Sequence, residues 1–145
     1  MTQAIKTPIL IDVRGPRFSA SLTVIVLAAA LATQNVWILF LQFAVFAIGA
    51  FKGPQFTPYA WIFKRFVKPR LKGESITEDV RPPQFAQKVG LGFSVVGLIA
   101  ISAGSISIFT IAVGFALAAA FLNAAFNYCL GCEMYLLALR LRTKN

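Results

Sequence analysis

Charged residues are missing from two long stretches of the chain. Residues 18–51 form a run of 34 without Lys, Arg, Asp or Glu, and residues 89–132 form a second run of 44. One helix of 34 residues would be about 51 Å long, whereas the hydrocarbon core of a bilayer is about 30 Å thick. Each run is therefore expected to cross a membrane twice, with a tight turn in its middle.

Helix-breaking residues occur where these turns are needed. Thr33-Gln34-Asn35 interrupts the first run, and Ser102-Ala103-Gly104-Ser105 interrupts the second. The first two helices are short and require local bilayer thinning or snorkelling at their ends. The pattern predicts an all-α fold, a four-helix transmembrane bundle, with helices at about 18–33, 36–52, 85–102 and 106–127.

The charges define a topology. All fourteen Lys and Arg and all five Asp and Glu lie outside the two runs, giving a net charge of +9 on a chain that is 58% hydrophobic. Each hairpin begins and ends on one side, so both termini and the 52–88 connection share a compartment, which the positive-inside rule makes the cytoplasm. The basic charge is therefore a topology signal and a contact with the lipid bilayer, and no nucleic-acid partner is expected.

The two halves of the chain begin alike. The pattern D-V-R-x-P-x-F occurs at residues 12–18 and again 67 residues later at 79–85, directly before each hairpin. Matching halves with an even number of crossings predict a parallel internal repeat whose axis lies near the membrane normal. We expect a single membrane domain over residues 1–145, with one repeat at 10–71 and the other at 77–142.

The segment between the hairpins predicts an amphipathic helix in the membrane interface. Thr57 is a suitable N-cap, Pro58 suits the first helical position, and Pro69 limits the end. Apolar side chains recur on one expected side: Phe56, Tyr59, Phe63, Phe66 and Val67. The expected lipid-interface residues are Trp61, Lys64, Arg65 and Lys68. The Leu- and Arg-rich tail predicts a second, short interfacial helix. Within the bundle, Gln42 is expected to make an interhelical hydrogen bond.

The cysteine thiols are the reactive side chains that the composition leaves as candidates for catalysis. The chain has no His, which excludes imidazole catalysis and His-ligated metals, and its two cysteines are Cys129 and Cys132. Their i, i+3 spacing brings the thiols close together. A helix from Ile106 to Leu141 would be about 54 Å long, so the chain must bend, and Gly131 is the expected place. The C-x-x-C motif is therefore expected at the cytoplasmic mouth of the fourth helix.

Four interpretations of this motif are open. In the first, the pair is a redox dithiol or a carrier of sulfane sulfur. In the second, it binds a metal, either Cu(I) or a Zn ion shared between the subunits of a homodimer. No other cofactor is expected. Alternatively it lines a path for a small sulfur species, with Asn123 and Asn127 on the same helical face, or both thiols are small apolar fillers.

The environment of the motif predicts which thiol attacks. If a new helix begins near Cys132, its N-terminal dipole favours the Cys132 thiolate, whereas Cys129, at the end of the preceding helix, would be the resolving thiol. Tyr128 and Gly131 complete the motif, and the carboxylate of Glu133 opposes ionisation.

The N-Y-C-L-G-C-E-M-Y stretch at 127–135, with the D-V-R-x-P-x-F pattern before each hairpin, resembles a bacterial family of small four-helix membrane proteins. That family is catalogued as a domain of unknown function and is common in actinobacteria. The resemblance covers nearly the whole chain, and Pro16, Phe18, Pro83 and Phe85 match its pre-helix motifs. Its members tend to be encoded near thioredoxin-like and rhodanese-type proteins, which implies thiol or sulfane-sulfur chemistry with such partners.

We therefore expect a multi-pass protein of the bacterial plasma membrane with cytoplasmic termini. Its Cys129/Cys132 dithiol is expected to exchange disulfides or sulfane sulfur with a soluble partner, as a thiol–disulfide oxidoreductase or a sulfur-relay component. The alternatives are a small transporter or channel for a sulfur compound and a structural subunit of a membrane complex.

Overall fold

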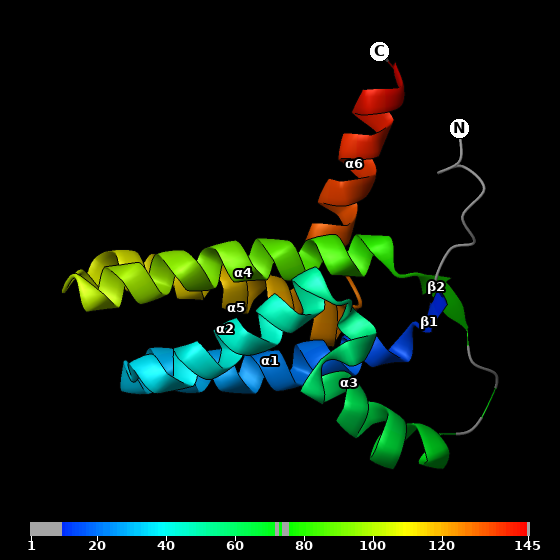
Figure 1. The fold of residues 1–145 in the computed structure, drawn as a ribbon, viewed down its shortest axis with the longest axis horizontal. Coiled ribbons are helices and arrows are strands. Elements are labelled where there is room, and N and C mark those ends of the chain that lie inside the picture. Colours follow the sequence, from blue (N-terminus) through cyan, green and yellow to red (C-terminus); the bar gives the residue numbers. More distant parts are fainter. Residues whose placement is uncertain (1–9, 72, 74–75, 145) are drawn as a thin grey trace.

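Four apolar helices form the body of the molecule (Figure 1). The computed structural model describes residues 10–71, 73 and 76–144. α1 and α2 form one hairpin and α4 and α5 form another, and each helix of one hairpin packs against one of the other, α1 on α5 and α2 on α4. The predicted all-helical class is confirmed. The bounds are α1 (Arg14–Thr33), α2 (Val36–Phe51), α4 (Arg81–Ser102) and α5 (Ile106–Phe126).

Three of these helices, α1, α4 and α5, are long and apolar enough to cross a membrane, which indicates a membrane protein. α2 has 16 residues, so it is about 24 Å long and shorter than a typical hydrocarbon core. Large apolar side chains lie exposed along the outer faces of the bundle, as lipid contact requires: Ile25, Phe40, Ile99, Ile111 and Phe115.

The predicted breakers make both hairpin turns. Gln34 adopts a left-handed conformation with φ of 53°, and the side chain of Asn35 then caps α2 by accepting the Trp37 N–H at 2.9 Å. In the second turn Gly104 has φ of 85°, and Ser105 caps α5. Both turns lie at the end of the bundle opposite to the strand pair described below (Figure 1).

A hydrogen-bonded polar link joins α1, α2 and the segment after α2 inside the bundle. Gln42 on α2 is fully buried; its Nε2 donates to Thr23 Oγ1 on α1 at 3.5 Å, and its Oε1 accepts the Tyr59 hydroxyl at 2.8 Å. The predicted interhelical hydrogen bond is thereby confirmed. Burial raises the pKa of Tyr59 to about 12, so its hydroxyl stays protonated and donates at physiological pH.

A two-stranded ribbon, which the sequence pattern did not predict, joins the starts of the two hairpins. β1 (Leu10–Asp12) pairs antiparallel with β2 (Thr77–Asp79), with Ile11 opposite Glu78. Asp12 Oδ1 accepts the Arg14 backbone N–H at 2.9 Å, and Asp79 Oδ1 accepts that of Arg81 at 2.9 Å. After these Asp turns, α1 and α4 begin at Arg14 and Arg81, four residues before the predicted starts at about 18 and 85.

Two further helical segments run across the bundle axis at the ribbon end, on opposite sides of the bundle (Figure 1). α3 (Pro58–Ile62) continues as a π-helical turn η3 (Phe63–Val67) and a 3-10 turn η4 (Lys68–Arg70), and a 3-10 turn η2 (Pro54–Phe56) precedes it. α6 (Leu130–Lys144) is the second segment.

The prediction that the first segment has a single apolar side is wrong. Tyr59 and Phe63 are buried against the bundle, whereas Phe56 and Phe66 are exposed on the outside with Trp61. Phe56 lies in the separate 3-10 turn η2, and the π-helical turn changes the periodicity from Phe63 onward, so the spacing of one ideal α-helix does not place these residues on one face.

Candidate dithiol site

The fourth helix of the bundle ends at Phe126, before the cysteine motif. Asn127 follows in the left-handed conformation with φ of 56°, and the Tyr128 N–H donates to Leu122 O at 3.2 Å. The predicted bend at Gly131 is therefore wrong; the chain turns at residues 127–129, because Asn tolerates the left-handed conformation that closes a helix. Asn127 lies outside the helix, which ends at Phe126. The prediction that Asn123 and Asn127 share a helical face is therefore also wrong.

Gly131 lies inside α6 and is buried. A Cβ at this position would lie 2.5 Å from the Cα of Ala86 on α4, so a glycine is needed for the close approach of the two helices. The rings of Phe85 and Tyr135 stack beside this contact with centroids 5.7 Å apart. Gly131 therefore positions the first turn of α6 against α4.

Cys129 is the N-cap of α6. The Cys129 Sγ accepts the Cys132 backbone N–H at 3.1 Å, and the Cys129 carbonyl accepts the Glu133 N–H at 3.0 Å. A new helix does begin near Cys132, as predicted, and it starts at Leu130. The prediction that Cys129 ends the preceding helix is wrong, because α5 ends at Phe126. Both sulfurs belong to the N-terminal turn of one helix.

The two sulfurs are bonded as a disulfide, with the Cα atoms 5.1 Å apart. Both residues are half-buried, while Tyr128 and Glu133 beside them are exposed. Among the residues that the structure describes, no three or more His, Cys, Asp or Glu side chains gather to hold a metal ion. Binding of Cu(I), or of Zn between two copies, stays a prediction resting on two sulfur ligands per chain.

An arginine that the sequence reasoning did not single out holds the end of α5. Arg17 Nε on α1 donates to Ala124 O at 3.1 Å, in the last turn before the motif. The other hairpin has a matching contact, in which Gln84 Nε2 on α4 donates to Ala50 O at 2.9 Å. Arg17 and Gln84 occupy the same position 67 residues apart, but this is a variable position of the D-V-R-x-P-x-F pattern, so the pattern gave no signal for either residue.

The start of α3 has the same geometry as the start of α6. Thr57 Oγ1 accepts the Ala60 N–H at 3.1 Å, and the Thr57 carbonyl accepts the Trp61 N–H at 3.0 Å. The stacking of Phe18 on Phe63, 5.8 Å between centroids, matches that of Phe85 on Tyr135. The dithiol therefore occupies the positions that Thr57 and Ala60 hold in the first half.

The predicted lipid-interface residues divide into two groups. Trp61 is 59% exposed and makes an edge-to-face contact with Phe66, and the Arg65 guanidinium lies 5.7 Å from the centre of the same ring. Lys64 and Lys68 contact the chain instead: Lys64 Nζ donates to Gln55 O at 2.9 Å, and Lys68 Nζ lies 3.6 Å from Asp12 Oδ2.

The fold and the motif define a small helical membrane protein with a C-x-x-C pair at a helix N-terminus. A family model described as a domain of unknown function (DUF4395) matches residues 11–140, and the chain belongs to this family. No curated protein and no solved structure matches the chain.

Proposed function

We propose that the Cys129/Cys132 dithiol exchanges disulfides or sulfane sulfur with a soluble protein in the cytoplasm. The observation that carries this proposal is the hydrogen bond from the Cys132 N–H to the Cys129 Sγ at the N-terminus of α6. A helix N-terminus and its free N–H groups stabilise a thiolate, which is the nucleophile in both reactions. We therefore assign the attacking thiol to Cys129 and the resolving thiol to Cys132.

In disulfide exchange, the Cys129 thiolate attacks one sulfur of a partner disulfide, and the other partner sulfur leaves as a thiolate. The Cys132 thiolate then attacks the Cys129 Sγ and releases the second partner thiolate. The chain is oxidised by two electrons, and the partner disulfide is reduced to a dithiol. In sulfane-sulfur transfer, the Cys129 thiolate attacks the terminal sulfur of a partner persulfide, the partner thiolate leaves, and Cys129 carries the persulfide.

The proposed topology has all four bundle helices crossing the plasma membrane, α2 with local thinning of the bilayer. The end that carries the strand pair, α3 and α6 then faces the cytoplasm together with the basic residues. The matching contacts of the two halves, at Asp12 and Asp79 and at Arg17 and Gln84, support the proposed repeat at 10–71 and 77–142. A single dithiol at one end moves electrons within one compartment.

Glutathione disulfide tests the assignment of the two thiols, because the chain has no other cysteine. The purified, reduced full chain is mixed with glutathione disulfide and its mass is followed. Cys132→Ser is expected to accumulate a glutathione adduct on Cys129, and Cys129→Ser to react at least about tenfold more slowly. The reverse order of rates would overturn the assignment to Cys129. If both variants reacted at the same rate, and no faster than an unstructured thiol, neither cysteine would be activated and the proposed function would be overturned.

Two measurements in cells test the remaining parts of the proposal. Membranes trapped with iodoacetamide after mild oxidation are expected to contain the Cys129–Cys132 disulfide or a persulfide, and finding neither would rule out the function. A membrane-impermeant maleimide is expected to label the reduced thiols in inverted vesicles and not in intact cells. Labelling in intact cells would reverse the topology.

A further inference from the structure

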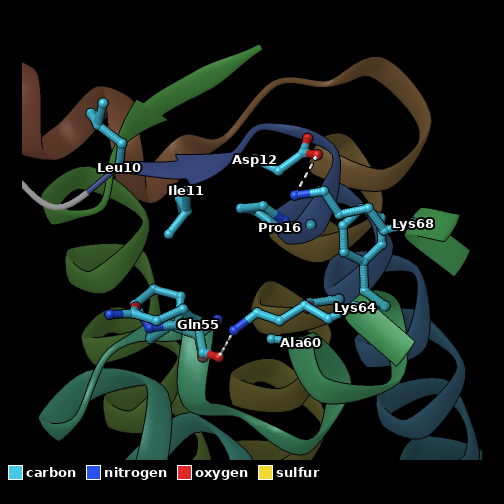
Figure 2. A pocket seen from close by; sticks show the side chains of 13 residues that line it. Leu10, Ile11, Asp12, Pro16, Gln55, Ala60, Lys64 and Lys68 are labelled. Carbon is cyan, nitrogen blue, oxygen red and sulfur yellow. Dashed lines mark hydrogen bonds and ion pairs between the residues drawn. The ribbon is translucent and has the colours of Figure 1, made fainter. Parts of the chain in front are cut away.

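A cavity of about 260 Å³ lies at the ribbon end of the bundle, away from the dithiol motif. It is bounded by β1, the start of α1, η2, the α3–η4 segment and one residue of α4. Figure 2 shows Leu10 and Ile11 on one side of the open space and Gln55, Lys64 and Ala60 on the other, with Asp12 and Lys68 at one edge. None of these groups takes part in the proposed sulfur chemistry.

Two ammonium groups supply hydrogen-bond donors to this cavity. Lys64 Nζ donates to Gln55 O at 2.9 Å, and Lys68 Nζ lies 3.6 Å from Asp12 Oδ2. An ammonium carries three N–H bonds, so each lysine has donors beyond these contacts. Asp12 is the acidic residue of the lining, and its carboxylate is paired with Arg14 at 2.9 Å. The two lysines therefore leave the cavity with a net positive charge.

Gln55 and Gln87 also line the cavity, from η2 and from α4. Their Oε1 atoms are buried away from it, because a Cβ at Gly53 would lie 2.6 Å from Gln55 Oε1 and a Cβ at Gly49 would lie 2.7 Å from Gln87 Oε1. The lysine ammonium groups are therefore the donors that a ligand in the cavity would meet.

We propose that the cavity binds the phosphodiester of a phospholipid headgroup. The lysines bind the phosphate by charge-assisted hydrogen bonds. The exposed Trp61 and Phe66 lie on the same α3–η3 segment, as expected where acyl chains leave the site. This inference is independent of the proposed thiol exchange.

Native mass spectrometry of the full chain in detergent tests the proposal with phosphatidylethanolamine and with diacylglycerol, which lacks the phosphodiester. Phosphatidylethanolamine is expected to bind more tightly than diacylglycerol. Equal binding of the two would overturn the role of the phosphate. Displacement of bound phosphatidylethanolamine by an equal concentration of glycerophosphoethanolamine would assign the site to a soluble headgroup; retention would assign it to the lipid.

Matched variants separate the cavity from general attraction to charge. Lys64→Gln with Lys68→Gln is expected to weaken phosphatidylethanolamine binding at least about tenfold. Arg65→Gln with Arg70→Gln removes the same charge from the same segment but outside the cavity lining, and is expected to change binding less than about twofold. Equal losses in both variants would overturn the proposal.

A cavity-filling variant keeps both lysines. Ala60→Leu places a larger side chain in the lining and is expected to block binding, while circular dichroism and the unfolding midpoint check that the chain folds. If the folded Ala60→Leu chain and the folded double-lysine variant both bind phosphatidylethanolamine like the unchanged chain, the cavity is not its site.

Discussion

The segments that follow the two hairpins begin with the same capping geometry and lie in different surroundings. At the start of α3, Thr57 is 2% exposed and its hydroxyl also donates to Pro54 O at 3.0 Å, while Tyr59 and Ala60 are buried. At the start of α6, Gly131 is buried but both cysteines are half-buried, and most of the helix after them is exposed.

This difference separates the structural part of the cap from its chemistry. An N-terminal turn with a side-chain acceptor at the N-cap serves to start a helix in both places. In the first half the acceptor is sealed inside the protein and bonded on both sides. In the second half the same position holds a sulfur atom that reagents can reach, so chemistry is proposed at α6 and a structural role at α3.

Exchanging the two caps is expected to give the largest effect. Cys129→Thr with Cys132→Ala, which copies the first half, should abolish thiol exchange completely while leaving the helices intact, because Thr caps a helix at least as well. The measurement is glutathione-adduct formation, with circular dichroism as the check on folding. Remaining exchange activity would show that the preparation contains another source of thiols.

The converse change moves the dithiol into the first half. In the cysteine-free background, Thr57→Cys with Ala60→Cys is expected to react with iodoacetamide at least about tenfold more slowly than Cys129 and Cys132 do in the native chain. Burial of residues 57 and 60 is the reason. Equal alkylation rates in the folded protein would mean that burial does not distinguish the two caps.

Close packing of α6 on α4 provides the next test. Gly131→Ala is expected to destabilise the chain by about 1–3 kcal/mol, since its Cβ would overlap the backbone of Ala86. The matched control is Gly15→Ala on α1, where the added Cβ would lie 3.7 Å from the Phe63 ring and should be tolerated. Unfolding in detergent measures both, and a Gly131→Ala chain as stable as the control would contradict the close approach.

The sequence was enough to locate the four bundle helices, because charge-free runs and breakers such as Gln34 and Gly104 act locally. Thr57 was likewise predicted as an N-cap from its residue type and is confirmed as one. Cys129 gave no such signal, since cysteine is not a usual cap. The ribbon between β1 and β2, and the need for a glycine opposite Ala86, depend on segments distant in the sequence, which hydropathy does not bring together.

Loss of the hydrogen bond between Tyr59 and Gln42, which ties α3 to the bundle, is expected to have a smaller effect. No matching hydrogen bond is described at α6. Tyr59→Phe leaves Gln42 Oε1 without its donor and should cost about 1 kcal/mol of unfolding free energy. Adding Gln42→Leu removes the unpaired acceptor, so the double variant should lose less than the sum of the two single variants. Strictly additive losses would show that the two side chains are not coupled.

The smallest difference concerns the paired Asp turns. The side chain of Asp12 is 6% exposed, and that of Asp79 is 30% exposed. Asp12→Asn should therefore lower the unfolding midpoint more than Asp79→Asn does. The shift for Asp79→Asn should be about 1 °C or less. The Arg81 guanidinium lowers the pKa of Asp79. Its stabilising contribution is therefore present at neutral pH and is lost as the pH falls through the lowered value. Unfolding midpoints of the native chain and Asp79→Asn should thus converge in acid, and a gap that widens as the pH falls would contradict the ion pair.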